Sequence, residues 1–301
     1  MTRVLIAESV DEKVLAEFQG KLEFVYSPDI TPQELETKIR DFDGLIVRPK
    51  PVSAKVIANA KRLKLIIRGG AGVNSIDLTA CREKGIIVEN TPGLNSDATA
   101  EFTVLLMLQA FAKRQVELAN IRSREGNSGQ PEDYMGRELK GKKLGIIGFG
   151  NIGKRVARIA EGFGMELIIH SRKTVLKDLL NSGCDIILLH IPLSAETTGL
   201  IGEKEFALMK NGTVIINTAR PQLIDVRAFK AALESGKISS FGIDGDYDLV
   251  KPFIDADVEK KGIITHHIAD STYEAQANIT RAALTQAVEF FMNGKEINHV
   301  I

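Results

Sequence analysis

A glycine-rich stretch between a short apolar run and a helical pattern constrains this chain more than any other feature. It reads GFGNIG over residues 148–153, directly after the apolar run 143–147. Glycines at this spacing permit a tight turn from strand to helix, a close approach of backbone to phosphate, and close packing of helix on strand. The stretch therefore predicts a dinucleotide-binding unit, with the phosphates at the helix N-terminus. We expect the cofactor contacts at Gly148, Gly150, Asn151, Ile152 and Gly153.

Size and charge limit the kinds of partner. The chain has 301 residues, enough for two domains, and its formal net charge is zero. No basic arm or long apolar segment stands out, so we expect no nucleic acid and no membrane as partners. The run 4–6 is too short for a signal peptide, and the two cysteines have no metal-binding or redox spacing. We expect a cytoplasmic protein that binds small molecules and no metal, without a regulatory domain after Ile301.

Short apolar runs that end in polar residues alternate with amphipathic segments along the chain. This alternation is typical of doubly wound parallel sheets. A first series covers residues 4–90, and a second begins at 143 after the polar segment 125–137. We expect one long helix over 98–124 and a last helix over 271–292. The predicted fold class is α/β, with two Rossmann-like doubly wound parallel-sheet domains separated by a cleft.

Ligands of open α/β sheets bind where the strands end, so the polar residues there are candidates. In the first series these residues follow the third, fourth and fifth strands. The glycine-rich turn 69–72 could form an anion site from backbone N–H groups, although a plain tight turn is the alternative. Cations after the third strand could bind a second anionic group or be solvated. The substrate candidates are Arg48, Lys50, Gly70, Ala71, Gly72 and Asn95.

The strand that follows the glycine-rich stretch ends in Ser171-Arg172-Lys173. An acidic residue at this place would bond the ribose hydroxyls and repel a 2′-phosphate. Ser171 can only hydrogen-bond, while Arg172 and Lys173 could neutralise a phosphate. The cofactor is thus NAD or NADP, with NADP suspected. The alternative is that both cations are ordinary surface charges.

Three chemically useful side chains end strands of the second series. Arg220 can bind carboxylate and carbonyl oxygens together. A histidine at 266–267 can donate or accept a hydroxyl proton near neutral pH. With Asp244 at the intervening strand and a dinucleotide nearby, they predict hydride transfer on a 2-oxo acid.

With these residues in place, the chain resembles the D-isomer-specific 2-hydroxyacid dehydrogenases, and is most similar to their phosphoglycerate-oxidising branch. The resemblance covers nearly the whole length and rests on motifs in a specific order. These are the segments 72–77, 90–95, 100–101, 144–153, 190–193, 217–220 with Asp225, and 267–268 with 271–272.

The resemblance implies a substrate-binding, flavodoxin-like domain of residues 1–97 plus 272–301, and an NAD(P)-binding domain of residues 98–271. It implies a homodimer formed through the cofactor domain. Arg220 takes the substrate-orienting role and His267 the acid/base role. The nicotinamide side would be lined by His190, Ile191, Pro192, Thr218, Ala219, Asp244, His267 and Ala269.

Several residues depart from the family pattern. The glutamate that normally pairs with the histidine is replaced by Leu249, so Asp246 or Asp248 would have to serve. Pro221 follows the arginine where glycine is usual, and Ala269-Asp270 replaces Gly-Gly. The segment between Ser171 and Asp185 has room for only one helix. These changes weaken the expectation of full activity and of tight cofactor binding.

Two classes of function follow. The leading class is an oxidoreductase that moves hydride between a nicotinamide and a small D-2-hydroxy acid. Phosphoglycerate is favoured because Arg48 and Lys50 could bind its phosphate, and hydroxypyruvate or glyoxylate reduction is the close alternative. The second class is a catalytically weakened sensor that keeps only cofactor binding.

Overall fold

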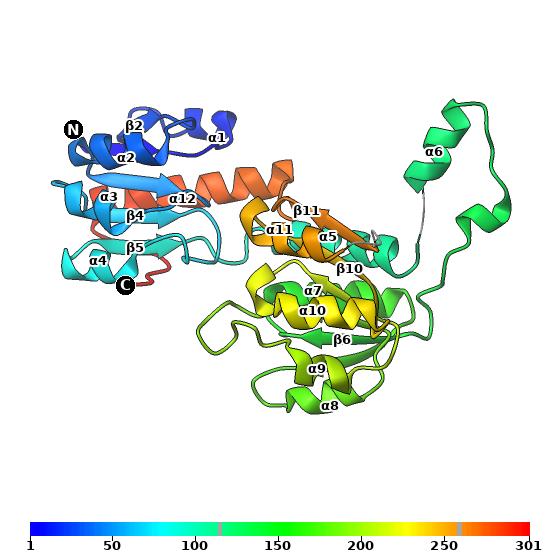
Figure 1. Ribbon diagram of the computed structural model, residues 1–301. Helices are drawn as coiled ribbons and strands as arrows, with labels where there is room; N and C mark the ends of the chain where they lie inside the picture. The colour runs from blue at the N-terminus through cyan, green and yellow to red at the C-terminus, as the bar shows by residue number, and fades with distance from the viewer. Residues whose placement is uncertain (114–115, 258–260) are drawn as a thin grey trace. The chain divides into compact units, whose positions relative to one another are not determined.

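The computed structural model describes residues 1–113, 116–257 and 261–301. The chain divides into two compact units, here called unit 1 (residues 1–95 and 271–301) and unit 2 (residues 96–270) (Figure 1). The chain leaves unit 1 at 95/96 and returns at 270/271, whereas the sequence placed these crossings at 97/98 and 271/272. Each unit is an α/β structure around a parallel sheet.

Unit 1 has a five-stranded sheet in the order β2-β1-β3-β4-β5, and every pair is parallel. This is the flavodoxin-like order, in which the direction of winding reverses between β1 and β3. The four-residue strands are β1 (Arg3–Ile6), β2 (Glu23–Tyr26), β3 (Gly44–Val47), β4 (Leu65–Arg68) and β5 (Ile87–Asn90).

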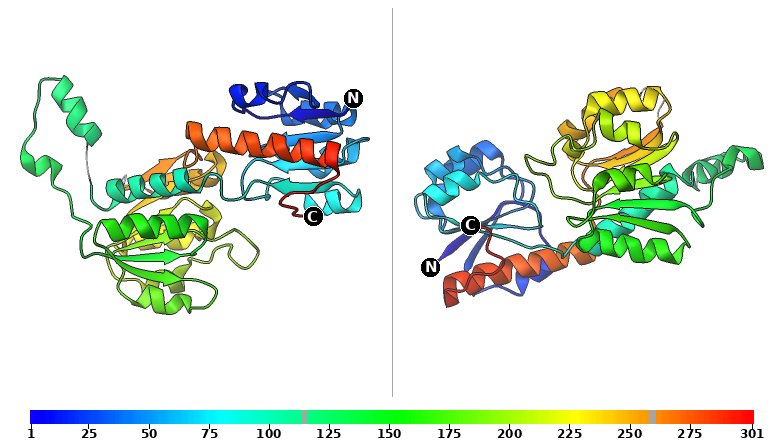
Figure 2. Two further views of the ribbon diagram at one scale, coloured as in Figure 1. Left: turned by 180° about the vertical axis from the view of Figure 1, so that it is seen from behind. Right: turned by 90° about the horizontal axis from the view of Figure 1, so that it is seen from below.

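Helices cover both faces of this sheet. One core packs the side chains of α2, α3 and α4 against one face, and a second core packs α1 and α12 against the other. Figure 2 shows the C-terminal helix α12 running along one face of the sheet in the view from below. The helices are α1 (Glu12–Ala16), α2 (Pro32–Lys38), η1 (Ile39–Asp41), α3 (Ala54–Asn59), α4 (Leu78–Glu83) and α12 (Tyr273–Asn293).

Unit 2 has a six-stranded parallel sheet in the order β11-β10-β9-β8-β6-β7. Its winding reverses between β6 and β8, which makes their carboxyl ends the expected ligand position. The strands are β6 (Lys143–Ile147), β7 (Glu166–His170), β8 (Ile186–Leu189), β9 (Thr213–Asn217), β10 (Ile238–Asp244) and β11 (Gly262–Thr265).

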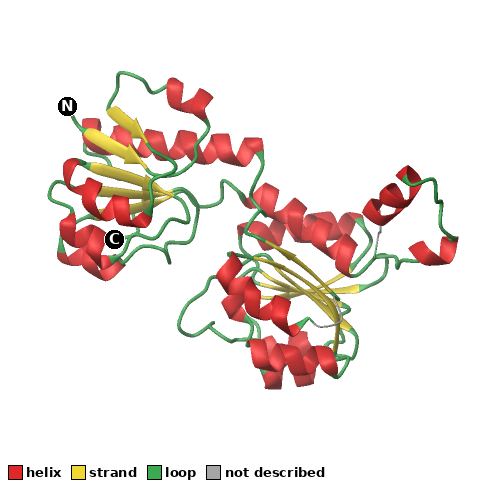
Figure 3. Cartoon of the chain, turned by 45° about the horizontal axis from the view of Figure 1, so that its top comes forward, coloured by secondary structure: helices red, strands yellow, loops and turns green. Residues whose placement is uncertain are grey.

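The strands of unit 2 lie between two layers of helices (Figure 3). Helices α5 and α7 pack on one face, and α8 to α11 pack on the other. These strands are apolar along nearly their whole length because both faces are covered. The helices are α5 (Ser96–Ala110), α6 (Val116–Arg124), η2 (Pro131–Tyr134), α7 (Asn151–Gly162), α8 (Leu176–Asn181), α9 (Glu203–Leu208), η3 (Pro221–Leu223), α10 (Val226–Glu234) and α11 (Tyr247–Ala256).

The single long helix expected over 98–124 is wrong. Helix α5 ends at Ala110, residues 111–113 are not helical, and α6 spans Val116–Arg124. Lys113 adopts a positive φ of 52°, a conformation that ends an α-helix. The Arg137 N–H donates to the carbonyl of Ala112 (2.9 Å), so the chain returns at residue 137 to the place it left. Helix propensity favours one continuous helix. The hydrogen bond from Arg137, however, requires an Ala112 carbonyl that is not used within a helix.

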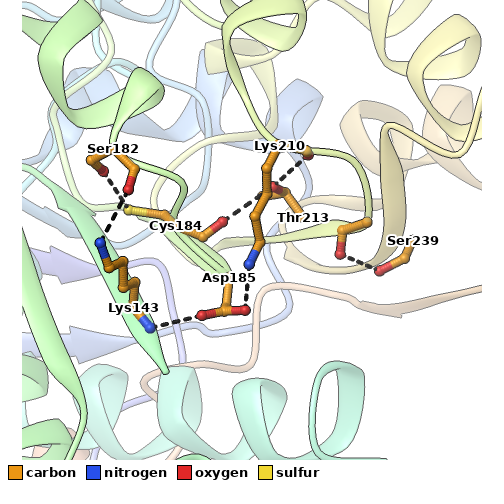
Figure 4. Close-up of polar contacts among 8 residues, drawn as sticks. Lys143, Ser182, Cys184, Asp185, Lys210, Thr213 and Ser239 are labelled. Atoms are coloured by element: carbon orange, nitrogen blue, oxygen red, sulfur yellow. Dashed lines mark hydrogen bonds and ion pairs between the residues drawn. The ribbon is translucent and has the colours of Figure 1, made fainter. Parts of the chain in front are cut away.

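The amino edge of the unit 2 sheet is closed by its own side chains (Figure 4). Asp185 accepts the backbone N–H of Lys143 (2.8 Å) and pairs with the ammonium of Lys210. Burial raises the pKa of Asp185, but these two donors outweigh it and hold the pKa below its ordinary value. The Thr213 hydroxyl donates to the Cys184 carbonyl (3.2 Å). This cluster stabilises the strand starts.

No helix within the described ranges is both long and apolar enough to cross a membrane.

Candidate active site at the carboxyl edge of unit 2

The glycine-rich turn joins β6 to α7 as the sequence predicted. Gly148 has a φ of 102°, which side-chain-bearing residues rarely adopt, and its N–H donates to the carbonyl of His170 (2.9 Å). A Cβ on Gly153 would lie 2.1 Å from the Gly148 carbonyl oxygen. Both glycines are therefore required by the backbone itself, because any side chain would push the helix away from the strand.

The N-terminus of α7 is built to receive an anion. Gly150 occupies the N-cap position, and no described side chain caps the helix. A Cβ on Gly150 would meet no described atom within 4 Å. A ligand can therefore reach the first-turn N–H groups of Asn151 and Ile152 through the open space beside Gly150. An uncapped helix start of this kind fits a pyrophosphate.

His190 follows β8 and borders the same turn. Its N–H donates to the Ile147 carbonyl (2.7 Å), and its own carbonyl oxygen would lie 2.4 Å from a Cβ on Gly148. Both ring nitrogens are buried and have no hydrogen-bond partner among the described residues. Burial lowers the pKa of His190 to about 4. A neutral imidazole with unsatisfied nitrogens fits a polar ligand group at this strand end. Ile191 is half-buried and Pro192 exposed.

The turn after β7 presents positive charge to solvent. Arg172 and Lys173 are exposed, while Ser171 is half-buried. The backbone N–H of Ser171 donates to the Thr174 hydroxyl (2.9 Å), so the turn is fixed by its own side chains. Because the Gly148 N–H donates to the His170 carbonyl, this turn lies beside the glycine-rich turn 148–153.

The turn that carries Arg220 is held by Asn217, a residue that was not predicted to belong to the site. Asn217 accepts the N–H groups of Ala219 (3.0 Å) and Arg220 (3.2 Å), and it donates to the Arg220 carbonyl (2.8 Å). This is an Asx-type turn, and an asparagine directly before the candidate residues was its sequence signal. The guanidinium of Arg220 donates to the Ala219 carbonyl (2.7 Å).

A buried hydroxyl pair fixes the same turn from the other side. The Thr103 hydroxyl donates to the Thr99 carbonyl (2.7 Å) and lies 2.8 Å from the Thr218 hydroxyl. Since Thr103 uses its proton on the carbonyl, Thr218 donates to Thr103. Helix α5 thereby positions the end of β9, a contact for which the sequence has no local signal.

Asp244 is buried and holds the turn after β11. Its Oδ1 accepts the Thr265 hydroxyl (2.6 Å) and the Ile268 N–H (2.9 Å), and its Oδ2 accepts the Ala269 N–H (3.0 Å). His267, inside this turn, has a φ of 55°, which is strained for a residue with a side chain. The hydrogen bonds to the two following residues offset that strain. Asp244 is thus bound to the turn that presents His267.

Asp246 takes the place that the sequence left open. Its Oδ1 lies 2.8 Å from Nδ1 of the half-buried His267. Leu249 lies within α11 and carries no charge, and Asp248 is exposed. A carboxylate at Nδ1 fixes the ring so that Nε2 can exchange a proton with substrate. Of the two candidate acids, Asp246 is therefore the one that contacts the imidazole.

The substrate candidates of unit 1 lie at its own carboxyl edge and bond to neighbours there. Arg48 donates to the Gln276 side chain. The Lys50 ammonium donates to the carbonyls of Pro28 (3.0 Å) and Ile30 (2.7 Å). A substrate phosphate would have to share this ammonium with two carbonyls.

The glycine-rich turn of unit 1 is also partly satisfied. The Gly70 N–H donates to the Thr91 hydroxyl (2.6 Å), and the Ala71 carbonyl accepts the Asn90 side chain (2.7 Å). Gly72 and Asn95 lie in the loops that follow β4 and β5. An anion would therefore use the N–H groups beyond Gly70.

The arrangement in unit 2 can bind a dinucleotide at α7, orient a carboxylate with Arg220, and move a proton through His267. Among the described residues no cluster of three or more His, Cys, Asp or Glu could hold a metal ion. Both cysteines are buried and free, and burial raises the pKa of Cys81 to about 11. Fold and site together define a nicotinamide-dependent oxidoreductase class.

Comparison with known proteins identifies the family. Residues 104–269 match the family model of the D-isomer specific 2-hydroxyacid dehydrogenase NAD binding domain. The chain is 33% identical to the glyoxylate reductase of Thermococcus litoralis over 96% of its length and 93% of that protein. The chain belongs to the D-isomer specific 2-hydroxyacid dehydrogenases.

Further relatives include phosphoglycerate dehydrogenases. The enzyme of Archaeoglobus fulgidus is 34% identical over 92% of this chain, and the chain spans only 55% of that protein's length. The NAD⁺-bound 3-phosphoglycerate dehydrogenase structure from Entamoeba histolytica has a TM-score of 0.84 at 28% identity and covers 100% of this chain and 98% of its own.

Proposed function

We propose that the chain is an NAD(P)-dependent D-2-hydroxyacid dehydrogenase. The observation that carries this proposal is the Asp246–His267 pair, 2.8 Å apart, at the strand end next to the Arg220 turn. The sensor alternative rests on three departures: the loss of an acidic partner at Leu249, the proline after Arg220, and the short segment between Ser171 and Asp185. The contact of Asp246 with His267 weakens the first of these three arguments.

The residues of unit 2 divide the reaction among them. Arg220 binds the substrate carboxylate and polarises the carbonyl. His267 donates a proton to the carbonyl oxygen in reduction and removes it in oxidation, while Asp246 stabilises the charged ring. Gly148, Gly150, Asn151, Ile152 and Gly153 would hold the pyrophosphate. The nicotinamide supplies or accepts the hydride when bound, with His190, Ile191, Pro192, Thr218, Ala219, Asp244 and Ala269 around it.

Turnover tests the proposal directly. Purified protein is mixed with NADH or NADPH and a panel of 2-oxo acids, and nicotinamide absorbance is followed. We expect consumption of cofactor with at least one acid, and stoichiometric formation of the D-2-hydroxy acid. Cofactor binding without turnover on any acid would favour the sensor.

Phosphohydroxypyruvate and D-3-phosphoglycerate are the proposed substrate pair, because Arg48 and Lys50 add cations to the carboxylate site at Gly70, Ala71, Gly72 and Asn95. Hydroxypyruvate or glyoxylate is the second candidate, favoured by the engagement of the Lys50 ammonium with two carbonyls. Lys50→Ala should raise KM only for phosphorylated acids. An equal rise for glyoxylate would remove the phosphate role.

For the cofactor, the exposed Arg172 and Lys173 support use of NADPH at least as well as NADH. Ser171 can bond a ribose hydroxyl or a phosphate without repelling either. kcat/KM is measured with both cofactors on the wild type and on Arg172→Ala. A preference for NADH above about tenfold, roughly 1.4 kcal/mol, contradicts the proposal.

We further propose a cytoplasmic homodimer assembled through unit 2. The Arg137 N–H bonds to the Ala112 carbonyl, and among the described residues between these two, Ile121 and Met135 are 46% and 71% exposed. An isolated helix of nine residues such as α6 is marginal in water, so a second copy covering it would stabilise it. Light scattering of Ile121→Glu should report a shift from dimer toward monomer.

A further inference from the structure

Gly245 lies between the turn that carries Arg220 and the strand that leads to His267. Its N–H donates to the Thr265 carbonyl (3.1 Å), which extends the pairing of β10 with β11 toward His267. A Cβ on Gly245 would lie 2.4 Å from Cγ and 2.9 Å from Cδ of Pro221. Pro221 directly follows Arg220. Gly245 therefore touches the turn of the arginine on one side and the strand of the histidine on the other.

The neighbours of Gly245 make its position consequential. Asp244 binds the backbone on the far side of His267, and Asp246 binds the imidazole itself. Both Gly245 and Pro221 are buried, and the Val250 side chain would lie 3.3 Å from the added Cβ. Interiors are close-packed, so a displacement here is not absorbed locally. A shift of residue 245 is expected to carry the two flanking carboxylates with it.

Gly245 has no positive φ, so the backbone conformation does not require glycine. The two shortest contacts of an added Cβ are both with the proline ring, and the Val250 contact is longer. The ring also fixes φ at residue 221 and so limits the freedom of the Arg220 turn. Glycine at 245 and proline at 221 are thus sterically complementary.

We propose that Pro221 and Gly245 are matched positioning residues that set Arg220 against the Asp246–His267 pair. The inference rests on the proposed dehydrogenase function. It predicts that a side chain at 245 harms turnover only while the proline ring is present.

A double-mutant cycle tests the match. Gly245→Ala should lower kcat about tenfold to a hundredfold, as expected for misplacement of catalytic groups by about 1 Å, with the cofactor Kd within about threefold. In the Pro221→Ala background, which lacks Cγ and Cδ, the same change should cost less than about threefold. Gly162→Ala is the control, because a Cβ there meets no described atom within 4 Å and the residue lies at the far end of α7.

Equal loss of kcat from Gly245→Ala in both backgrounds overturns the proposal. So does a coupling that appears in the Tm alone, since a merely structural contact would change stability without changing kcat. If Gly245→Ala does not fold, recovery of folded, active protein in the double variant supports the match, and failure of the double variant to fold overturns it.

Failure of the proposed function has a separate signature. If the wild type turns over no 2-oxo acid, the cycle is read from the imidazole NMR resonances of His267. Resonances that shift in Gly245→Ala and return in the double variant keep the positioning role while the dehydrogenase assignment falls. Resonances that do not shift in any variant remove the positioning role.

Discussion

Each unit has a topological switch point at the carboxyl edge of its sheet, and the two are filled differently. In unit 1 the switch lies between β1 and β3. There Gln276 accepts from Arg48 and donates to the Ser9 carbonyl (2.8 Å), and Glu8 accepts the Lys50 N–H (2.7 Å). Side chains of unit 1 thus bond to one another across the switch.

In unit 2 the switch lies between β6 and β8 and carries glycines instead. The helix start at Gly150 has no cap among the described side chains, and His190 keeps two buried, unpaired ring nitrogens. The comparison shows that topology selects the place where a ligand can bind. A ligand can bind at that place only where neighbouring side chains have not already formed hydrogen bonds with its polar groups.

Removal of the proton carrier is the strongest test of unit 2 as the reactive unit. His267→Ala should lower kcat by about a thousandfold, within the range typical of general acid/base groups. Cofactor affinity should change by no more than a few fold, because the pyrophosphate site is separate. Steady-state rates and fluorescence titration measure the two quantities, and intact activity in this variant would refute the assignment of the base.

The next test closes the open switch point. Gly153→Ala places a Cβ 2.1 Å from the Gly148 carbonyl, so α7 must move away from β6. We expect cofactor affinity to fall about a hundredfold, roughly 2.7 kcal/mol, together with a lower Tm. Gly162→Ala serves as the matched control on the same helix. Wild-type affinity in the Gly153 variant would show that the close approach is not needed.

Acid should affect the stability of the two units in opposite directions. His190 has its folded pKa lowered by burial to about 4, against about 6.5 in the unfolded chain. Unfolding then takes up a proton below pH 6.5, so unit 2 loses about 2 to 3 kcal/mol as pH falls from 6.5 to 4. His190→Asn should lose much of this dependence in thermal unfolding.

Glu89 is the counterpart in unit 1. Burial raises its pKa to about 6, so the folded state holds its proton more tightly than the unfolded state. Its contribution, about 2 kcal/mol, is present below pH 4.5 and lost as pH rises through 6. Glu89→Gln should remove this pH dependence of stability. If the dependence of Tm on pH is the same in wild type, His190→Asn and Glu89→Gln, the two units do not respond to acid in opposite directions.

The smallest expected effect concerns the orienting acid. Asp246→Asn keeps the shape but removes the charge at Nδ1 of His267, and we expect kcat to fall about tenfold, roughly 1.4 kcal/mol. Asp248→Asn, on the exposed side of α11, is the control and should keep activity within about twofold. Equal losses in the two variants would mean that the Asp246 contact is not specific.

Much of this molecule follows from local sequence. Apolar runs and polar strand ends predicted both parallel sheets, and the glycine spacing predicted the β6–α7 turn. The interruption between α5 and α6 was not predictable, because it depends on the hydrogen bond from Arg137 to Ala112 across a long excursion. The spacing of apolar residues indicates which face of a helix is buried. It does not indicate where a backbone N–H distant in sequence will form a hydrogen bond.

The sequence by itself determined the residue types at the strand ends: the glycines, Arg220 and His267. Only the tertiary structure decided that Asp246 meets His267, that Lys50 is held by two carbonyls, and that Gly245 receives the ring of Pro221. Local backbone conformation and the spacing of apolar residues depend on neighbours along the chain, and these neighbours can be read directly from the sequence. Side-chain pairing is set by which strand ends lie together, and this is fixed only when the sheets have formed.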